Sequence, residues 1–157
     1  MLYAYDIFDF LALLSALMLA GLMAILSTVM RKMWRDQNDA EAAASFKHFL
    51  KYAATDRILS TMSITPVIAA LVMALVAKPT GAQAGYAYVG GGIFLVGFFL
   101  WTALFNLPIY KAVDAWTLAE APSDTRTQIG RFHRSNAVRL VASLVTAVLF
   151  FLAVSSA

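Results

Sequence analysis

Polar side chains interrupt three otherwise apolar stretches of the sequence at the spacing of a helix. The longest set stands at intervals of four residues: Thr102, Asn106, Tyr110 and Asp114. Residues four apart share one face of a helix. Pro108 lies in the same stretch and has no backbone N–H, so a carbonyl about one turn earlier loses its helical partner. Polar groups inside an apolar helix need partners and mark either a packing seam or a functional site.

The other two sets stand at the start of their apolar stretches. One stretch begins after Asp56 and Arg57. Another opens with an imidazole, an amide and a cation at intervals of three residues: His133, Asn136 and Arg139. Since all three sets lie toward the same end of their segments, we expect them to meet in one polar pocket.

Arg139 lies one to two helical turns inside its apolar stretch. A buried arginine needs an acidic or carbonyl partner, because an unpaired charge is costly to bury. Asp56 and Asp114 are the candidate partners. Such a pair would be either a structural ion pair or a functional one.

The two histidines, His48 and His133, raise haem ligation and metal binding as further chemistry. His48 falls on the polar face of its predicted helix, and no third histidine or carboxylate stands at ligand spacing. We therefore expect interfacial histidines, no metal site and no cofactor, with haem or a quinone as the open alternatives.

The composition decides which elements carry these residues. Of 157 residues, 61% are hydrophobic and 13% are charged, against roughly 45–50% and about 25% in an average soluble domain. A domain of this size has too much surface to hide that excess, which excludes a soluble globular enzyme. The absence of cysteine excludes disulfides, iron–sulfur clusters and zinc fingers.

Four uncharged stretches approach or exceed the roughly 20 residues that a membrane-spanning helix needs. They predict an all-α integral membrane four-helix bundle in one domain, residues 1–157, with spans at about 8–32, 56–77, 86–111 and 134–155. Residues 79–85 are polar and turn-forming, so the third span is expected to begin near Tyr86.

A short amphipathic helix is expected on the cytoplasmic side, before the second span. Asn38 and Glu41 have the spacing of a capping box, and apolar residues follow them at helical intervals. Thr125 and Gln128 predict a second capping box at the start of the fourth helix.

Basic residues predict the orientation. Of the twelve Lys and Arg residues, all but Lys78 lie between spans one and two or between spans three and four. By the positive-inside rule these segments are cytoplasmic and both termini are non-cytoplasmic, in a bacterial inner membrane. Trp34 and Trp116 fit interfacial positions, and membrane lipids are the expected partners, with no nucleic acid.

The residues of the predicted pocket resemble a known family. Residues 106–110, with the sequence NLPIY, resemble an Asn-x-Pro-x-Asn element. That element ends the third span in the anthrone-oxygenase-like family of small four-helix integral membrane proteins. Tyr110 replaces the second Asn, a departure that leaves the substrate open.

A second element of the same family, resembling Trp-x-x-[His/Asn]-x-x-Arg, opens the fourth span. Asn136 and Arg139 match it, and its aromatic residue falls at or beside His133. The resemblance covers residues 86–157, and residues 10–77 only in topology.

The resemblance implies a membrane-embedded oxygenase acting on polyketide anthrones. Oxygenation without a cofactor needs a base to make the substrate anion and a cation or amide to hold it. Catalytic roles then fall on His133 as the base, Arg139 and Asn136 as anion-holding groups, and Asn106 as an orienting group. Four more residues are assigned to substrate binding: Tyr110, Asp114, Asp56 and Arg57.

A non-catalytic role is the alternative. The small bundle without a dedicated redox ligand also suits an accessory subunit of a larger membrane complex, respiratory or photosynthetic, or a lipid- or quinone-binding protein. An enzyme should be stable alone and enclose a pocket for an apolar aromatic molecule. A subunit should expose a wide apolar flank and co-purify with its complex.

Overall fold

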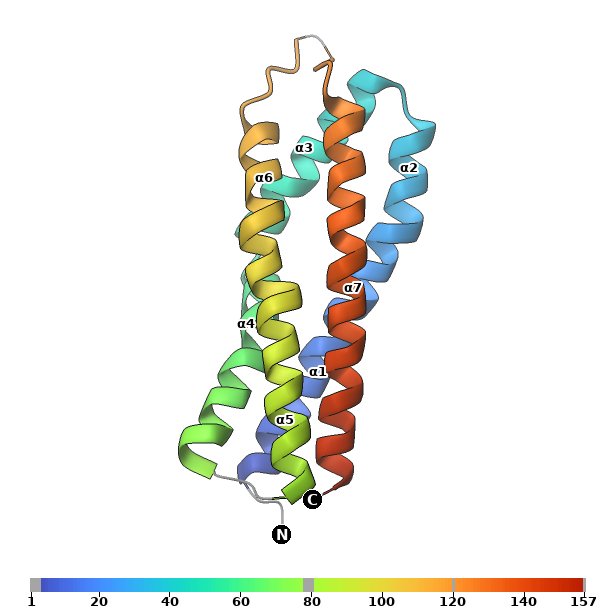
Figure 1. Cartoon of the computed structure of the whole chain (residues 1–157). Helices are drawn as coiled ribbons and strands as arrows, with labels where there is room; N and C mark the ends of the chain where they lie inside the picture. The colour runs from blue at the N-terminus through green and yellow to red at the C-terminus, as the bar shows by residue number, and fades with distance from the viewer. Residues whose placement is uncertain (1–3, 78–80, 120, 157) are drawn as a thin grey trace.

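A computed structural model of the chain describes residues 4–77, 81–119 and 121–156, and these residues contain helices and no strand. Four helical segments in this part of the chain are long and apolar enough to cross a membrane: Asp6–Asp36, Arg57–Leu75, Gly81–Asp114 and Thr125–Ser155. The predicted all-α four-helix bundle is therefore confirmed (Figure 1). Lys78 lies outside the described residues.

The long helices contain short π-helical stretches, which are labelled η. The first half of the chain comprises α1 (Ala4–Ile25), η1 (Leu26–Met30), α2 (Arg31–Asp36), α3 (Asp39–Thr55), α4 (Arg57–Val72) and η2 (Met73–Ala77). The second half comprises α5 (Gly81–Phe94), η3 (Leu95–Leu100), η4 (Thr102–Asn106), α6 (Leu107–Asp114) and α7 (Thr125–Ser155).

The two ends of the bundle differ in charge. At one end lie the start of α1, η2, the start of α5 and the end of α7; we call it the terminal end (Figure 1). At the other end lie α2, α3 and the connection from α6 to α7. We call this the basic end, because residues 31–57 and 111–139 carry all the Lys and Arg residues except Lys78.

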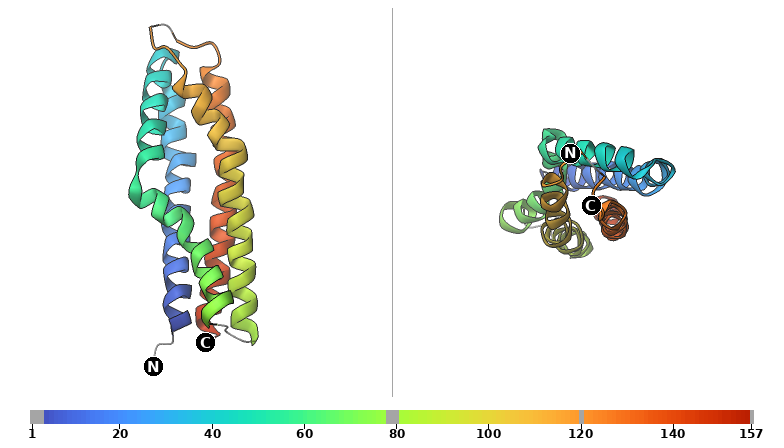
Figure 2. Two further views of the ribbon diagram at one scale, coloured as in Figure 1. Left: turned by 90° about the vertical axis from the view of Figure 1, so that its left-hand side faces the viewer. Right: turned by 90° about the horizontal axis from the view of Figure 1, so that it is seen from above.

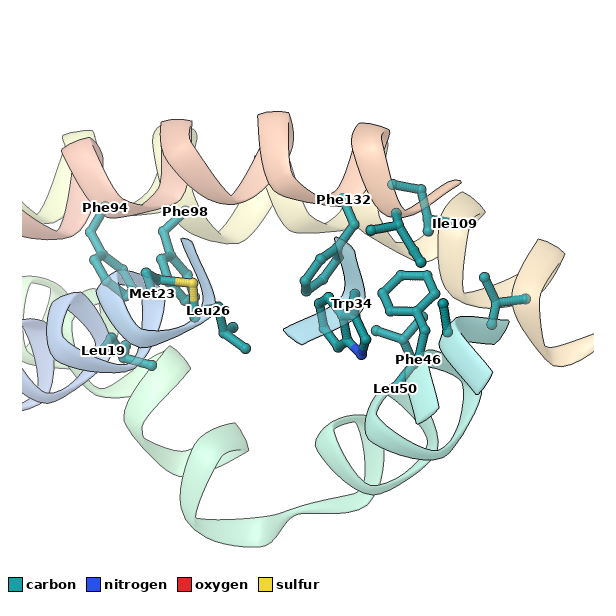
Figure 3. Packing of buried hydrophobic residues seen from close by; sticks show 13 residues of the cluster. Leu19, Met23, Leu26, Trp34, Phe46, Leu50, Phe94, Phe98, Ile109 and Phe132 are labelled. Carbon is teal, nitrogen blue, oxygen red and sulfur yellow. The ribbon is translucent and has the colours of Figure 1, made fainter. Parts of the chain in front are cut away.

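Helix α7 packs against α1 and α5, and α4 packs against α1 and α5. The larger group of buried apolar side chains extends from the middle of the bundle to the basic end and includes Leu19, Met23, Trp34, Phe46, Phe94, Phe98 and Phe132. Figure 3 shows the rings of Trp34, Phe46 and Phe132 pointing toward one another, with Met23, Phe94 and Phe98 in a second group farther along. Trp34 is fully buried among these rings.

The predicted amphipathic helix is α3, and its capping box is confirmed. The Asn38 side chain accepts the Glu41 N–H at 2.9 Å, and the Glu41 carboxylate accepts the Asn38 N–H at 3.3 Å. Both bonds satisfy N–H groups that the first turn of a helix leaves without partners.

The predicted capping box at Thr125 is wrong. The residue before α7 is Asp124, and the Thr125 hydroxyl donates to the Pro122 carbonyl at 2.7 Å instead of capping the helix. Gln128 donates to the Asp124 carboxylate at 2.9 Å. The Thr125 hydroxyl therefore bonds to the turn that begins at Pro122 and does not cap the helix.

The third long helix begins at Gly81, before the predicted start near Tyr86. Gly81 has a φ of +66°, which glycine adopts without steric cost. The polar residue Gln83 is buried and donates to the Asp9 carboxylate at 3.0 Å. A polar stretch that looks like a turn is helical here because its glutamine has a partner on α1.

Close approach of α4 and α5 depends on Gly91, and this yields a stability prediction. A Cβ at Gly91 would lie 2.3 Å from the Ala70 Cβ, whereas a Cβ at Gly92 would meet nothing within 4 Å. Gly91→Ala should therefore lower the free energy of unfolding by about 1–3 kcal/mol, the usual cost of overpacking. Gly92→Ala should gain roughly 0.5–1 kcal/mol, because glycine is unfavourable inside helices. Thermal unfolding in detergent would contradict the packing if Gly91→Ala melted at or above Gly92→Ala.

Candidate functional site

A cleft of about 430 Å³ lies between α1, η1, α3, the start of α4, α6 and α7. Apolar and aromatic side chains form most of its lining: Leu22, Met23, Leu26, Phe49, Tyr52, Ala53, Leu59 and Phe132. Asp56, Tyr110 and Arg139 add polar groups to it. Met23 from one group of side chains in Figure 3 and Phe132 from the other both line it. The volume falls in the range of small-molecule pockets.

The cleft exists because the chain breaks between α3 and α4. Asp56 has an extended backbone, with φ −72° and ψ 122°, so α4 does not continue the axis of α3. Figure 2 shows α3 beside α2 and α4 leaving it at an angle. The Asp56 carboxylate accepts the Leu59 N–H at 2.7 Å and so caps α4. Its other oxygen has no hydrogen-bond partner among the described residues.

Arg139 is the buried cation of the cleft and is 5% exposed. Its guanidinium carbon lies 4.5 Å from the centre of the Phe98 ring, and the Tyr110 hydroxyl is its polar side-chain neighbour. The Nε atom is buried without an acceptor. Arg139 precedes the end of α7 at Ser155 by about 24 Å, at 1.5 Å per residue, and so lies within the thickness of an apolar bilayer core.

The predicted acidic partners of Arg139 are wrong. Within residues 4–77, 81–119 and 121–156, the ion pairs within 4.0 Å are those of Arg35 with Asp36 and Arg126 with Asp39. Asp56 caps α4, and Asp114 is exposed at the end of α6. The guanidinium therefore faces the cleft with an aromatic ring and a phenol beside it, and no described carboxylate lies within 4.0 Å of it.

The two predicted amides are fully buried and lie behind the cleft wall. Asn136 donates to the Met23 carbonyl at 3.3 Å, while its own oxygen has no partner. Asn106 accepts from the Ser135 hydroxyl, which in turn accepts from the Trp101 indole at 2.9 Å. Both amides thus hold helices together around the cleft, and neither belongs to its lining.

Pro108 explains how Asn106 reaches the interior. It stands in the first turn of α6, where a missing N–H is tolerated, and the π-helical stretches η3 and η4 precede it. A π-helical turn shifts the faces of a helix and is common at functional sites. Asn106 is consequently buried, whereas Thr102 only donates to the Phe98 carbonyl of its own helix.

His133 does not line the cleft. Its ring packs against Trp34, with the centroids 5.5 Å apart, and against Phe132, and both of its nitrogens are buried without partners. His48 is exposed on α3 beside Tyr52. No group of three His, Asp or Glu that could hold a metal ion occurs among the described residues.

Two more predicted site residues lie elsewhere. Asp114 lines a separate cleft of about 340 Å³ between α3 and α6, where Lys47 donates to the Asp114 and Trp116 carbonyls. Arg57 is exposed and lines a small groove on α4. The structure therefore brings Arg139, Tyr110 and Asp56 together, with the two amides behind them.

The sequence pattern did not reveal the apolar walls of the cleft. Phe49 and Tyr52 come from α3, which was expected to lie at the membrane surface, and Phe132 precedes the histidine that was singled out. The available signal was the apolar face of α3, because an apolar face packs against either lipid or the protein interior.

A family model described as anthrone oxygenase matches residues 46–149. The match begins upstream of residues 86–157, the part of the sequence that carried the resemblance. It includes every residue of the cleft lining except Leu22, Met23 and Leu26. Comparisons with curated proteins and with solved structures give no significant match.

Proposed function

The chain belongs to the anthrone oxygenase family, and from this premise we propose that it binds a planar phenolic anthrone in the cleft at Arg139 and oxygenates it. One observation carries the proposal: a buried guanidinium faces the cleft and forms no ion pair within 4.0 Å with any described carboxylate. A buried charge without a counter-charge is costly. An anionic ligand would supply the missing charge, and the apolar and aromatic walls suit flat rings.

The anion arises from the substrate itself. An anthrone loses a proton from its CH₂ group, and the resulting negative charge spreads onto the oxygen of its carbonyl. Arg139 is suited to hold that oxygen with charge-assisted hydrogen bonds, and Tyr110 is suited to donate a second one. Since charge on this oxygen develops in the reaction, these donors favour the anion over the neutral anthrone.

The reaction then consumes one O₂ per anthrone. The carbanion carbon passes electrons to O₂ and forms a C–O bond. Loss of water converts this carbon into the second carbonyl of a quinone. One oxygen atom of O₂ enters the quinone, and the other leaves as water with the two hydrogens of the original CH₂ group.

The proton acceptor must reach the CH₂ group of a bound anthrone. We assign this role to Asp56, whose carboxylate lines the cleft and has one oxygen without a partner among the described residues. His133, the candidate from the sequence, would require its ring to turn away from Trp34. Asn106 and Asn136 would act by keeping η4 and α7 in place around the cleft.

The proposal includes an orientation. The basic end would face the cytoplasm, with both termini on the other side of a bacterial inner membrane, because Lys and Arg concentrate on cytoplasmic segments. The cleft would then open near the cytoplasmic surface.

Oxygen uptake by the purified full chain tests the function. With a hydroxylated anthrone in detergent, we expect quinone absorbance to rise with one O₂ consumed per quinone. With ¹⁸O₂, one labelled atom should enter each quinone. A rate equal to that of protein-free detergent would contradict the oxygenase. Tight anthrone binding without uptake would then favour the non-catalytic binder, and co-purified membrane proteins would favour the accessory subunit.

A further inference from the structure

A second hollow lies on the outer side of the bundle, away from the cleft at Arg139. It is a groove of about 540 Å³ between α7 and the segment formed by η4 and α6. One part of its lining is apolar and aromatic and includes Trp101, Phe105 and Val138. The ring centroids of Trp101 and Phe105 lie 4.1 Å apart. The other part of its lining carries the basic residues Arg131 and Arg134.

The charges of this groove are uncompensated. Arg131 and Arg134 are exposed, and neither forms an ion pair or a hydrogen bond with any residue of the described ranges. Gln128 lies one turn before Arg131 on α7 and lines the same groove. Its side chain is 8% exposed, and its Oε1 atom is buried without a donor. The groove therefore presents two free cations one helical turn apart, while the Gln128 oxygen lies below its surface.

The depth of these residues corresponds to a lipid headgroup. At 1.5 Å per residue, Arg134 and Arg131 lie about 31 and 36 Å from the end of α7 at Ser155. The apolar core of a bilayer is about 30 Å thick. If Ser155 marks one boundary, both arginines lie in the opposite headgroup layer, and Trp101, Phe105 and Val138 lie at the level of the acyl chains.

We propose that this groove binds one anionic phospholipid, such as phosphatidylglycerol. The phosphodiester pairs with Arg131 and Arg134, and one acyl chain lies along Trp101 and Phe105. Charge complementarity selects this occupant, because a zwitterionic lipid brings its own cation toward the two arginines. The site is independent of the proposed oxygenase reaction.

The test is lipid retention by the full chain, measured by native mass spectrometry after exchange into detergent with equal phosphatidylglycerol and phosphatidylcholine. Arg131→Gln/Arg134→Gln should weaken phosphatidylglycerol binding by about 30-fold, the combined effect of two basic side chains near anionic lipid. The matched control is Lys32→Gln/Arg35→Gln, which removes two exposed charges from α2 at the same end of the bundle. It should keep the wild-type preference.

Val138→Trp provides a second variant that keeps both charges and fills the acyl part of the groove. It should lose the preference for phosphatidylglycerol, while circular dichroism and the melting temperature show that the bundle is intact. An equal loss in Arg131→Gln/Arg134→Gln and Lys32→Gln/Arg35→Gln would overturn the site in favour of general surface attraction. Retained binding in Val138→Trp would overturn the groove as its location.

Discussion

Arg139→Gln should reduce kcat by about 10²–10³-fold, the usual loss when a donor to a developing oxyanion is removed. Glutamine is shorter than arginine and uncharged, so it removes both the charge and the fork of N–H donors that reaches the oxyanion. The anthrone anion would then lack the cation that favours its formation, while the neutral anthrone would still pack against the aromatic walls. We therefore expect the KM for anthrone to change much less than kcat.

The same substitution should not destabilise the fold. Arg139 is buried without a carboxylate partner among the described residues, and removing an unpaired buried charge relieves its desolvation cost. The melting temperature of Arg139→Gln should equal or exceed that of the wild type. Arg139→Lys, which keeps the charge and loses the planar fork, should retain an intermediate rate. A lower melting temperature together with lost activity would point to a structural role for Arg139.

Asp56→Asn should lower kcat by about 10²–10⁴-fold, the usual contribution of a general base. Asparagine caps a helix as well as aspartate does, so the hydrogen bond to the Leu59 N–H and the start of α4 should persist. The substitution therefore removes the proton acceptor and leaves the cleft in place. Stopped-flow formation of the anthrone anion under argon would measure the affected step directly.

His133→Gln is the matched comparison for Asp56→Asn. With Asp56 as the base, His133→Gln should keep kcat near the wild-type value, because the ring packs against Trp34 outside the cleft lining. The reverse result, a large loss in His133→Gln and a small one in Asp56→Asn, would assign proton transfer to His133 and require its side chain to reorient on substrate binding.

The helices were predictable because their signals are local or follow from the solvent. A bilayer core excludes charge, so the gaps between charged residues mark the spans. The capping box of α3 depends only on Asn38 and Glu41, which lie three residues apart. The burial of Trp34 was not predictable, because it depends on Phe46 and Phe132, whose positions are set by tertiary packing.

The candidate site was predictable in part. Arg139 and Tyr110 meet because both are polar residues on inward faces of their helices. His133 follows Phe132 and is therefore turned by about 100° around α7, which directs it toward α2. Helical periodicity predicts the angle of a side chain around its own helix. Which neighbouring helix the side chain then contacts depends on the packing of the whole bundle. Asp114 and Arg57 lie outside the cleft lining for the same reason.

The break at Asp56 has a mechanical consequence. One non-helical residue joins α3 to α4, so a change in tilt between them is absorbed by a single pair of backbone torsion angles and breaks no hydrogen bond inside either helix. Helix α4 is 16 residues long, or about 24 Å. A rotation of about 10° at Asp56 would therefore displace its far end by about 4 Å over this length. The spacing between α4 and its neighbouring helices thus depends on the backbone torsion angles of Asp56.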